Sequence, residues 1–212
     1  MTEQRGASAE GTGRSGVLEP SRVDAVDAER ARLFALLGRL LSAVPDPALL
    51  AGLAGLRAEP TPLGEALGGL AEAARGAEPA ALEREFFDLF IGVGRGELLP
   101  YASYYLTGFL HERPLAELRA TLRRLGVERA AGVAEPEDHI AFGFEVLSGL
   151  VEGRFGAGPG AAEEFFARHL RPWAGRFFAD LEGAEAARFY RAVGRLGRVV
   201  VEIEQAAGDL PG

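Results

Sequence analysis

The chain has 212 residues, 48% of them hydrophobic, and a formal net charge of −8 at pH 7. This length and composition suit one domain with a sizeable core, and the acidic charge argues against nucleic-acid binding, which needs a concentrated basic face. Cysteine is absent, which excludes disulfides, thiolate nucleophiles and cysteine-ligated metal centres. All 23 basic residues are arginine, so no lysine is available for a Schiff base or a phosphate-binding loop.

Apolar residues recur at spacings of three to four along most of the chain, and β-branched residues are sparse, which favours helix over strand. We therefore predict an all-α fold, a single-domain bundle of about nine or ten helices. Residues 1–20 lack periodicity and are expected to form a disordered tail, with the helical domain over 21–207 and a frayed end over 208–212. No stretch approaches the roughly 18 apolar residues that span a bilayer, so we expect a cytoplasmic protein without stable membrane insertion.

Proline and capping residues predict where the helices begin. In the first half of the chain the predicted helices run from Ser21 to Pro45, Asp46 to Leu56, Thr61 to Arg75 and Pro79 to Ile91. Gly64, Gly68 and Gly69 should each weaken the third of these helices by about 1 kcal/mol relative to alanine, unless close packing compensates. In the second half, predicted helices start at Pro114, Pro136, Glu163, Pro172 and Glu185, and the last ends near Ala207.

The most concentrated group of polar side chains is Glu135-Pro136-Glu137-Asp138-His139. Proline fits the first position of a helix, so we predict a helix that opens at Pro136 and carries these side chains in its first turn, where the helix dipole favours acidic groups. Apolar residues at helical spacing follow, so most of this helix should be buried. Only the first turn of this helix can present polar side chains to a ligand.

Asp138 next to His139 suggests acid–base chemistry, since a carboxylate can orient an imidazole. Adjacent helical residues project about 100° apart, however, and no nucleophile is identifiable. The structural alternative is that Asp138 caps backbone N–H groups while His139 hydrogen-bonds a neighbouring loop. The histidines are unpaired, which leaves only a weak carboxylate site at Glu135 and Asp138 for a metal. We predict no catalytic residue, no metal and no cofactor.

Tyrosines cluster in Tyr101-Ala-Ser-Tyr-Tyr105, directly after a proline. Tyrosine combines a stacking face with a hydroxyl donor and is common where peptides bind, although core packing explains the cluster equally well. An acidic helix mouth, tyrosines and apolar helix faces together suit a peptide that carries arginines followed by apolar residues. Carboxylates would pair with the guanidinium groups, and an apolar groove would take the rest.

Three segments resemble motifs of the TorD/DmsD/NarJ family of redox-enzyme maturation chaperones. They are Glu85-Phe-Phe-Asp-Leu-Phe-Ile-Gly92, Leu99-Pro-Tyr-Ala-Ser-Tyr104 and Glu135-Pro-Glu-Asp-His139, in the order found in the family. The resemblance covers residues 22 to 207. Ala102 is a departure, because many members have a glutamate there, and the N-terminal tail has no match.

The resemblance implies an all-helical, non-enzymatic, cytosolic chaperone. Such a protein binds the twin-arginine leader or the apo catalytic subunit of a molybdopterin oxidoreductase, of the dimethyl sulfoxide/trimethylamine N-oxide reductase or formate dehydrogenase type, during cofactor insertion and before export. The implied peptide-binding residues are Glu135, Pro136, Asp138 and His139, with Tyr101, Ser103 and Tyr104 on the same surface and Phe90 and Trp173 as groove walls. A homodimer and guanine-nucleotide binding are known in the family and stay open here.

Three other functions remain as alternatives. The first is a NarJ-type chaperone of a nitrate reductase subunit that is not exported. The second, from a different class, is a small helical hydrolase or nucleotide-dependent enzyme that uses Asp138 and His139, against which the missing lysine, cysteine and phosphate loop all count. The third is a helical adaptor without chaperone activity.

Overall fold

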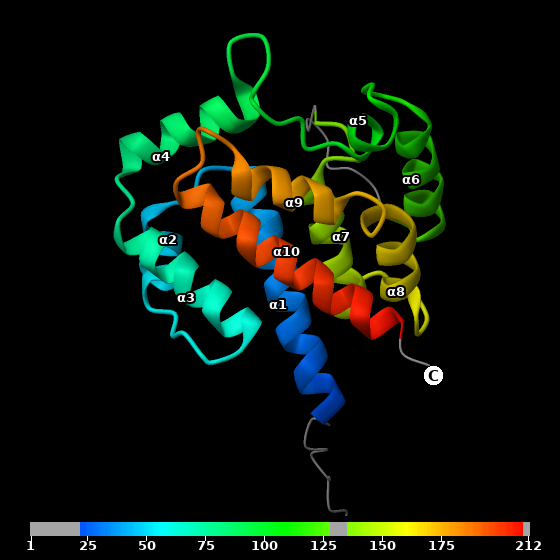
Figure 1. Cartoon of the computed structure of the whole chain (residues 1–212). Coiled ribbons are helices and arrows are strands. Elements are labelled where there is room, and N and C mark those ends of the chain that lie inside the picture. The colour runs from blue at the N-terminus through cyan, green and yellow to red at the C-terminus, as the bar shows by residue number, and fades with distance from the viewer. Residues whose placement is uncertain (1–21, 128–134, 210–212) are drawn as a thin grey trace, which may run out of the picture.

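Residues 22–127 and 135–209 are described by the structure, a computed structural model, and they form helices joined by short loops, with no strand among them (Figure 1). Two of the helices continue as π-helical turns, η1 (Phe87–Ile91) after α4 and η2 (Phe166–Leu170) after α8. The α-helices of the described residues are α1 (Arg22–Ser42), α2 (Pro47–Ala54), α3 (Pro62–Arg75), α4 (Pro79–Phe86), α5 (Ala102–Thr107), α6 (Arg113–Arg124), α7 (Ile140–Val151), α8 (Ala161–Phe165), α9 (Ala174–Gly183) and α10 (Phe189–Gly208).

The predicted all-α, single-domain bundle of about nine or ten helices is confirmed over these residues. The tail predicted over 1–20, the expected cap Ser21 and the end of the chain at 210–212 lie outside the described residues. Within the described ranges, no helix is both long enough and apolar enough to cross a membrane.

Local capping explains the starts of α2 and α3. The side chain of Asp46 accepts a hydrogen bond from the Leu49 N–H at 2.8 Å, and Thr61 accepts one from the Gly64 N–H at 3.0 Å. A proline follows each cap within the first helical turn, where its missing N–H costs nothing. These helices therefore begin where the sequence predicts.

The core is centred on α7, which packs along α1 and contacts α9 through an aromatic pair. Phe144 of α7 is fully buried, with its ring centroid 6.0 Å from that of Phe34 on α1 and 5.7 Å from that of Phe178 on α9. The long helix α10 runs diagonally across the bundle and contacts α9, α3 and α1 (Figure 1). Elements from both ends of the chain thus surround the helix that follows the polar motif.

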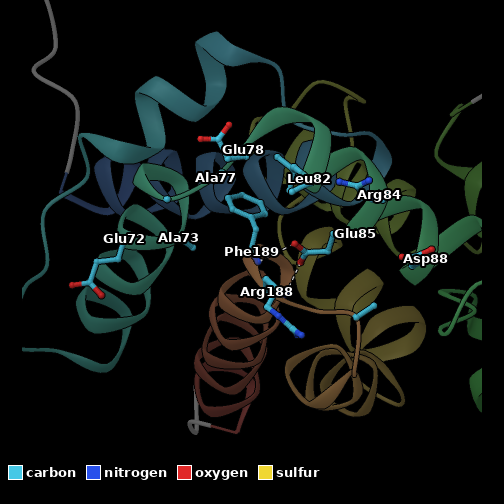
Figure 2. A pocket seen from close by; sticks show the side chains of 13 residues that line it. Glu72, Ala73, Ala77, Glu78, Leu82, Arg84, Glu85, Asp88, Arg188 and Phe189 are labelled. Carbon is cyan, nitrogen blue, oxygen red and sulfur yellow. Dashed lines mark hydrogen bonds between the residues drawn. The ribbon is translucent and has the colours of Figure 1, made fainter.

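The last helix begins at Phe189, four residues later than the predicted start at Glu185. The buried carboxylate of Glu85 accepts hydrogen bonds from the N–H groups of Arg188 at 2.7 Å, Phe189 at 3.2 Å and Tyr190 at 2.7 Å. Figure 2 shows this side chain pointing from α4 to the start of α10. A capping residue 103 positions away in sequence therefore fixes the helix start, which local patterns do not reveal.

Candidate functional site

The polar motif is a turn that precedes α7, so the prediction of a helix opening at Pro136 is wrong. The helix begins at Ile140, with His139 as its N-cap. The backbone of the motif pairs with the segment before α5 instead. The Ala102 N–H donates to Asp138 O at 2.9 Å, the Ile140 N–H donates to Pro100 O at 2.8 Å, and Tyr101 forms an isolated antiparallel bridge with His139. This pairing outweighs the preference of proline for a helix start.

Asp138 caps a helix other than its own. Its Oδ2 accepts a hydrogen bond from the Ser103 N–H at 2.9 Å, in the first turn of α5, where Tyr101 supplies no side-chain cap. Both Asp138 and Ser103 are almost completely buried. Asp138 Oδ1 and Ser103 Oγ are also buried and have no hydrogen-bond partner among the residues that the structure describes. The capping role that the sequence left as an alternative for Asp138 is therefore confirmed.

His139 holds the first turn of α7. Its Nδ1 accepts a hydrogen bond from the Ala141 N–H at 3.2 Å, so the imidazole proton lies on Nε2. Burial lowers the pKa of His139, although the charges of Glu135 and Asp138 act in the opposite direction. The ring is thus neutral at pH 7, as an acceptor must be. The expected hydrogen bond from His139 to a neighbouring loop is replaced by this cap.

The geometry does not assemble an acid–base pair from Asp138 and His139. Asp138 accepts a hydrogen bond from a backbone N–H of α5, and His139 accepts one from a backbone N–H of α7. Within the described part of the chain, no hydrogen bond joins the two side chains. In addition, no cluster of three or more metal-ligating side chains occurs among the described residues. The motif therefore connects the first turns of α5 and α7 through hydrogen bonds, and it is also partly exposed at the surface.

Neighbouring helices brace the remaining carboxylates of the motif. The Tyr101 hydroxyl donates a hydrogen bond to Glu135, and burial together with this bond raises the pKa of Tyr101, which keeps the phenol protonated. Glu137 forms an ion pair with Arg119 of α6, with an N–O distance of 2.7 Å. These contacts hold the turn against α5 and α6.

A groove of about 460 Å³ opens beside the motif, and we call it the motif groove. Its walls come from α1, α4, η1, the motif and α7, so they combine apolar side chains with carboxylates. The lining residues are Leu41, Ser42, Phe86, Phe90, Ile91, Tyr101, Glu135, Pro136, Glu137, His139, Ala141, Phe142 and Glu145.

A smaller cavity of about 270 Å³, the small cavity, also adjoins the motif. Tyr101 and Pro136 line both spaces. The small cavity is completed by Ser103, Leu110, His111 and Asp138.

The structure brings most of the predicted site residues together. Phe90, Tyr101, Glu135, Pro136 and His139 line the motif groove, while Ser103 and Asp138 line the small cavity. Two predicted residues line neither space, namely Tyr104 and Trp173.

Tyr104 and Trp173 pack outside these two spaces. Tyr104 packs edge-on against Tyr105, with ring centroids 6.0 Å apart. Trp173 is only 2% exposed, and its indole N–H donates to the His169 carbonyl at 2.7 Å. Trp173 is therefore a core residue and does not form a groove wall.

The sequence reasoning missed several lining residues. Glu145 is an exposed carboxylate on the otherwise buried α7, and Ile91 is 54% exposed in the π-helical turn. A lone acidic residue within an apolar helix is a signal that could have identified Glu145. Phe142 and Leu41 carry no such signal, because apolar residues at helical spacing look like core.

A larger cavity of about 600 Å³ lies between α3, α4 and the segment before α10. Figure 2 shows that Glu72, Glu78 and Asp88 are spread around its rim rather than converging. The inward carboxylate, Glu85, already caps α10. None of the predicted site residues lines this cavity, so the motif groove is the better candidate site.

Comparison with known proteins places the chain in a family. Residues 56–179, more than half of the chain, match the model of the nitrate reductase delta subunit family. The chain belongs to this family. The matched residues of the nitrate reductase delta subunit model include η1, the tyrosine segment and the motif, and the predicted family resemblance is thereby confirmed.

Curated relatives are named as chaperones. "Chaperone protein TorD" of Aliivibrio fischeri is 33% identical over 133 residues, which cover 57% of this chain and 62% of that relative. The protein of the same name from Vibrio cholerae is 30% identical over 137 residues, which cover 60% and 62%. The match therefore spans less than two thirds of the length of these relatives.

A solved structure supports the fold. A crystal structure of a candidate redox enzyme maturation protein from Archaeoglobus fulgidus superposes with a TM-score of 0.55. It shares 21% sequence identity, and the superposition covers 89% of this chain and 99% of that one. At this identity the likeness concerns the helical architecture alone. It agrees with the delta subunit family assignment.

Proposed function

We propose that this protein is a cytoplasmic, system-specific chaperone of a molybdopterin oxidoreductase. It binds the twin-arginine leader, the apo form of the catalytic subunit, or both, during cofactor insertion and before export. The client is of the dimethyl sulfoxide/trimethylamine N-oxide reductase or formate dehydrogenase type. The observation that carries the proposal is the motif groove, which sets carboxylates beside apolar walls in a member of a family with relatives named as chaperones.

The chemistry of the groove matches a leader that combines arginines with apolar residues. Glu145 lies exposed at the groove, and no hydrogen bond or ion pair of its side chain is seen among the described residues. A guanidinium group can therefore pair with it. Phe90, Ile91 and Phe142 offer apolar surface to the residues that follow the arginines. The net charge of −8 also favours the approach of a basic peptide.

Titration calorimetry with a synthetic twin-arginine leader tests this proposal. The peptide comes from the molybdoenzyme encoded nearest to this chain, and the control peptide has both arginines replaced by glutamine. We expect binding in the micromolar range or tighter that weakens with added salt, at least about tenfold weaker binding of the control, and about threefold to tenfold weaker binding to Glu145→Gln. Equal affinity for the two peptides would refute recognition of the arginines.

The family model carries the name of nitrate reductase, and this name supports a second candidate client. A NarJ-type chaperone would bind a segment of a reductase subunit that has no export leader. In that case the leader peptide does not bind, whereas the purified apo catalytic subunit does. A pull-down with both the apo and the cofactor-loaded subunit separates the two clients, because a maturation chaperone should release the loaded enzyme.

A further inference from the structure

Tyr190, the second residue of α10, packs against the motif groove from the buried side of its walls. Its side chain is completely buried and lines neither the motif groove nor the small cavity. Its ring centroid lies 5.8 Å from that of Phe86 and 5.4 Å from that of Phe90, and the centroids of these two rings are 5.1 Å apart. Phe86 and Phe90 both line the groove. The aromatic wall of the groove is therefore supported by a ring that does not itself face the groove.

The hydroxyl group of Tyr190 reaches a second wall of the groove. It donates a hydrogen bond to the Leu40 carbonyl at 3.1 Å, in the last turn of α1, where carbonyl groups lack N–H partners within the helix. Burial raises the pKa of Tyr190, so the phenol stays protonated and remains a donor. The two residues after Leu40, namely Leu41 and Ser42, line the groove. The hydroxyl thus holds the end of α1 against α10.

The backbone of Tyr190 makes a third contact. Its N–H donates a hydrogen bond to Glu85 Oε1 at 2.7 Å, and Glu85 directly precedes Phe86 in α4. Tyr190 therefore contacts α1, α4 and η1, in each case at or next to a residue of the groove wall. Phenylalanine would fill the same space, so packing alone does not explain a buried hydroxyl, which is costly to bury without its hydrogen bond.

We propose that Tyr190 is a positioning residue that sets the spacing between the end of α1 and the Phe86–Phe90 pair, and thereby selects the apolar side chains that the motif groove accepts. This inference rests on the proposed function for the nature of the ligand. Walls held in one arrangement discriminate between side chains of different size, because a poorly matched side chain leaves unfilled space or clashes. Walls that can shift accept more sizes and discriminate less.

Calorimetry on Tyr190→Phe tests this selection with pairs of leader peptides, in which one apolar residue after the arginines is either leucine or alanine. At the position that enters the groove, the wild type should prefer leucine by about tenfold. Tyr190→Phe should reduce this preference to about threefold or less. The loss of affinity on replacing both arginines with glutamine should stay the same, because the hydrogen bonds and ring contacts of Tyr190 do not include the carboxylates of the groove.

Tyr105→Phe is the matched control. Tyr105 is also buried, donates its hydroxyl to Asp180 at 3.0 Å and lines neither the motif groove nor the small cavity. Both variants are compared at a temperature at which circular dichroism shows them to be folded. Tyr105→Phe should keep the tenfold preference for leucine.

A double variant tests whether Tyr190 acts through the aromatic wall. Phe90→Leu alters this wall directly and should lower the preference for leucine. In the Phe90→Leu background, Tyr190→Phe should cause little further loss, because the effects of residues in contact are not independent. Losses of preference that multiply would overturn the action of Tyr190 through Phe90.

The outcomes separate this inference from the proposed function. If Tyr190→Phe melts at a lower temperature but keeps the tenfold preference, or if Tyr105→Phe loses it as well, the inference is refuted while the proposed function stands. If no leader peptide binds the wild type, the leader-binding form of the proposed function fails, and amide chemical shifts of the free protein decide the inference. Shifts at Ser42 and Ile91 in Tyr190→Phe would support the link between these groove walls, and unchanged shifts at both would refute it.

Discussion

At the scale of single residues, His139 both caps a helix and lines the candidate binding groove. Its Nδ1 accepts the Ala141 N–H, and its ring also lines the motif groove. Replacing it with alanine should lower the free energy of unfolding by about 1 kcal/mol, because the N-cap of α7 is lost. His139→Asn keeps a capping oxygen and should cost much less. Urea unfolding followed by circular dichroism measures both values.

The same two variants reveal whether the imidazole itself contacts the peptide. Equal loss of peptide affinity in His139→Ala and His139→Asn, despite their different stabilities, would assign the ring to binding. If peptide affinity falls only in His139→Ala, the less stable variant, the imidazole acts through its cap of α7 alone.

His169 should make the protein sensitive to acid. Its Nε2 lies 2.9 Å from Thr121 Oγ1, and burial lowers its pKa to about 4. The unfolded chain, with a histidine pKa near 6.5, takes up the proton first, so this contribution to stability is complete above about pH 6.5 and is lost as the pH falls toward 4. The loss should reach about 1 kcal/mol, after allowance for the partial exposure of the ring.

The variant His169→Gln isolates this effect, because glutamine can still hydrogen-bond Thr121. Melting temperatures measured from pH 7 to pH 4.5 should fall more steeply for the wild type than for the variant. Acidic contributions of other groups, including His139, cancel in the difference between the two curves. Parallel curves would show that His169 does not control the acid response.

At the scale of helices, carboxylates from distant segments set where two elements begin. Glu85 serves three N–H groups at the start of α10. Glu85→Ala should destabilise the protein by about 2–4 kcal/mol, because it leaves buried donors without partners. Glu85→Gln retains one acceptor oxygen and should fall between the wild type and alanine. Glu83→Ala, at an exposed position of the same helix, is the matched control and should be nearly neutral in chemical denaturation.

Two adjacent glycines of α3 should respond oppositely to alanine. A Cβ atom at Gly68 would lie 2.6 Å from the Cβ of Ala58, whereas a Cβ at Gly69 would meet nothing within 4 Å. Gly69→Ala should therefore stabilise the protein by about 0.5–1 kcal/mol through helix propensity, and Gly68→Ala should destabilise it. Differential scanning calorimetry compares the two. If both variants are more stable than the wild type, the segment around Ala58 moves away from the added methyl group without a loss of stability.

These elements also show what the sequence can and cannot predict. Asp46 and Thr61 cap through local contacts, so their helices could be placed from sequence. The start of α10 depends on Glu85, 103 positions away, and the turn of the motif depends on pairing with the Tyr101 segment, so local patterns misplace both. Trp173 illustrates the same limit, because an aromatic residue at a helix start is compatible with either a groove or a core.

At the scale of the whole molecule, the motif groove joins parts of the chain that lie far apart. Its walls include Leu41 of α1, Ile91 of η1 and Glu145 of α7. The motif could be predicted because its polar residues are contiguous, whereas these walls depend on how α1, η1 and α7 pack. A ligand that binds the folded groove and not the unfolded chain should therefore stabilise the entire bundle and raise its melting temperature.

Two partly exposed isoleucines test which apolar surface takes the ligand. Ile91 is 54% exposed at the motif groove, and Ile203 is 44% exposed in a separate apolar groove between α1 and α10. Serine at either position should change stability by less than about 1 kcal/mol, because neither side chain is fully buried. Ile91→Ser should weaken binding of the leader peptide by about threefold to tenfold, since apolar contact is lost only there. Calorimetry should show wild-type affinity for Ile203→Ser. Weaker binding to Ile203→Ser and wild-type affinity for Ile91→Ser would instead place the apolar part of the ligand in the α1–α10 groove, which no residue of the polar motif lines.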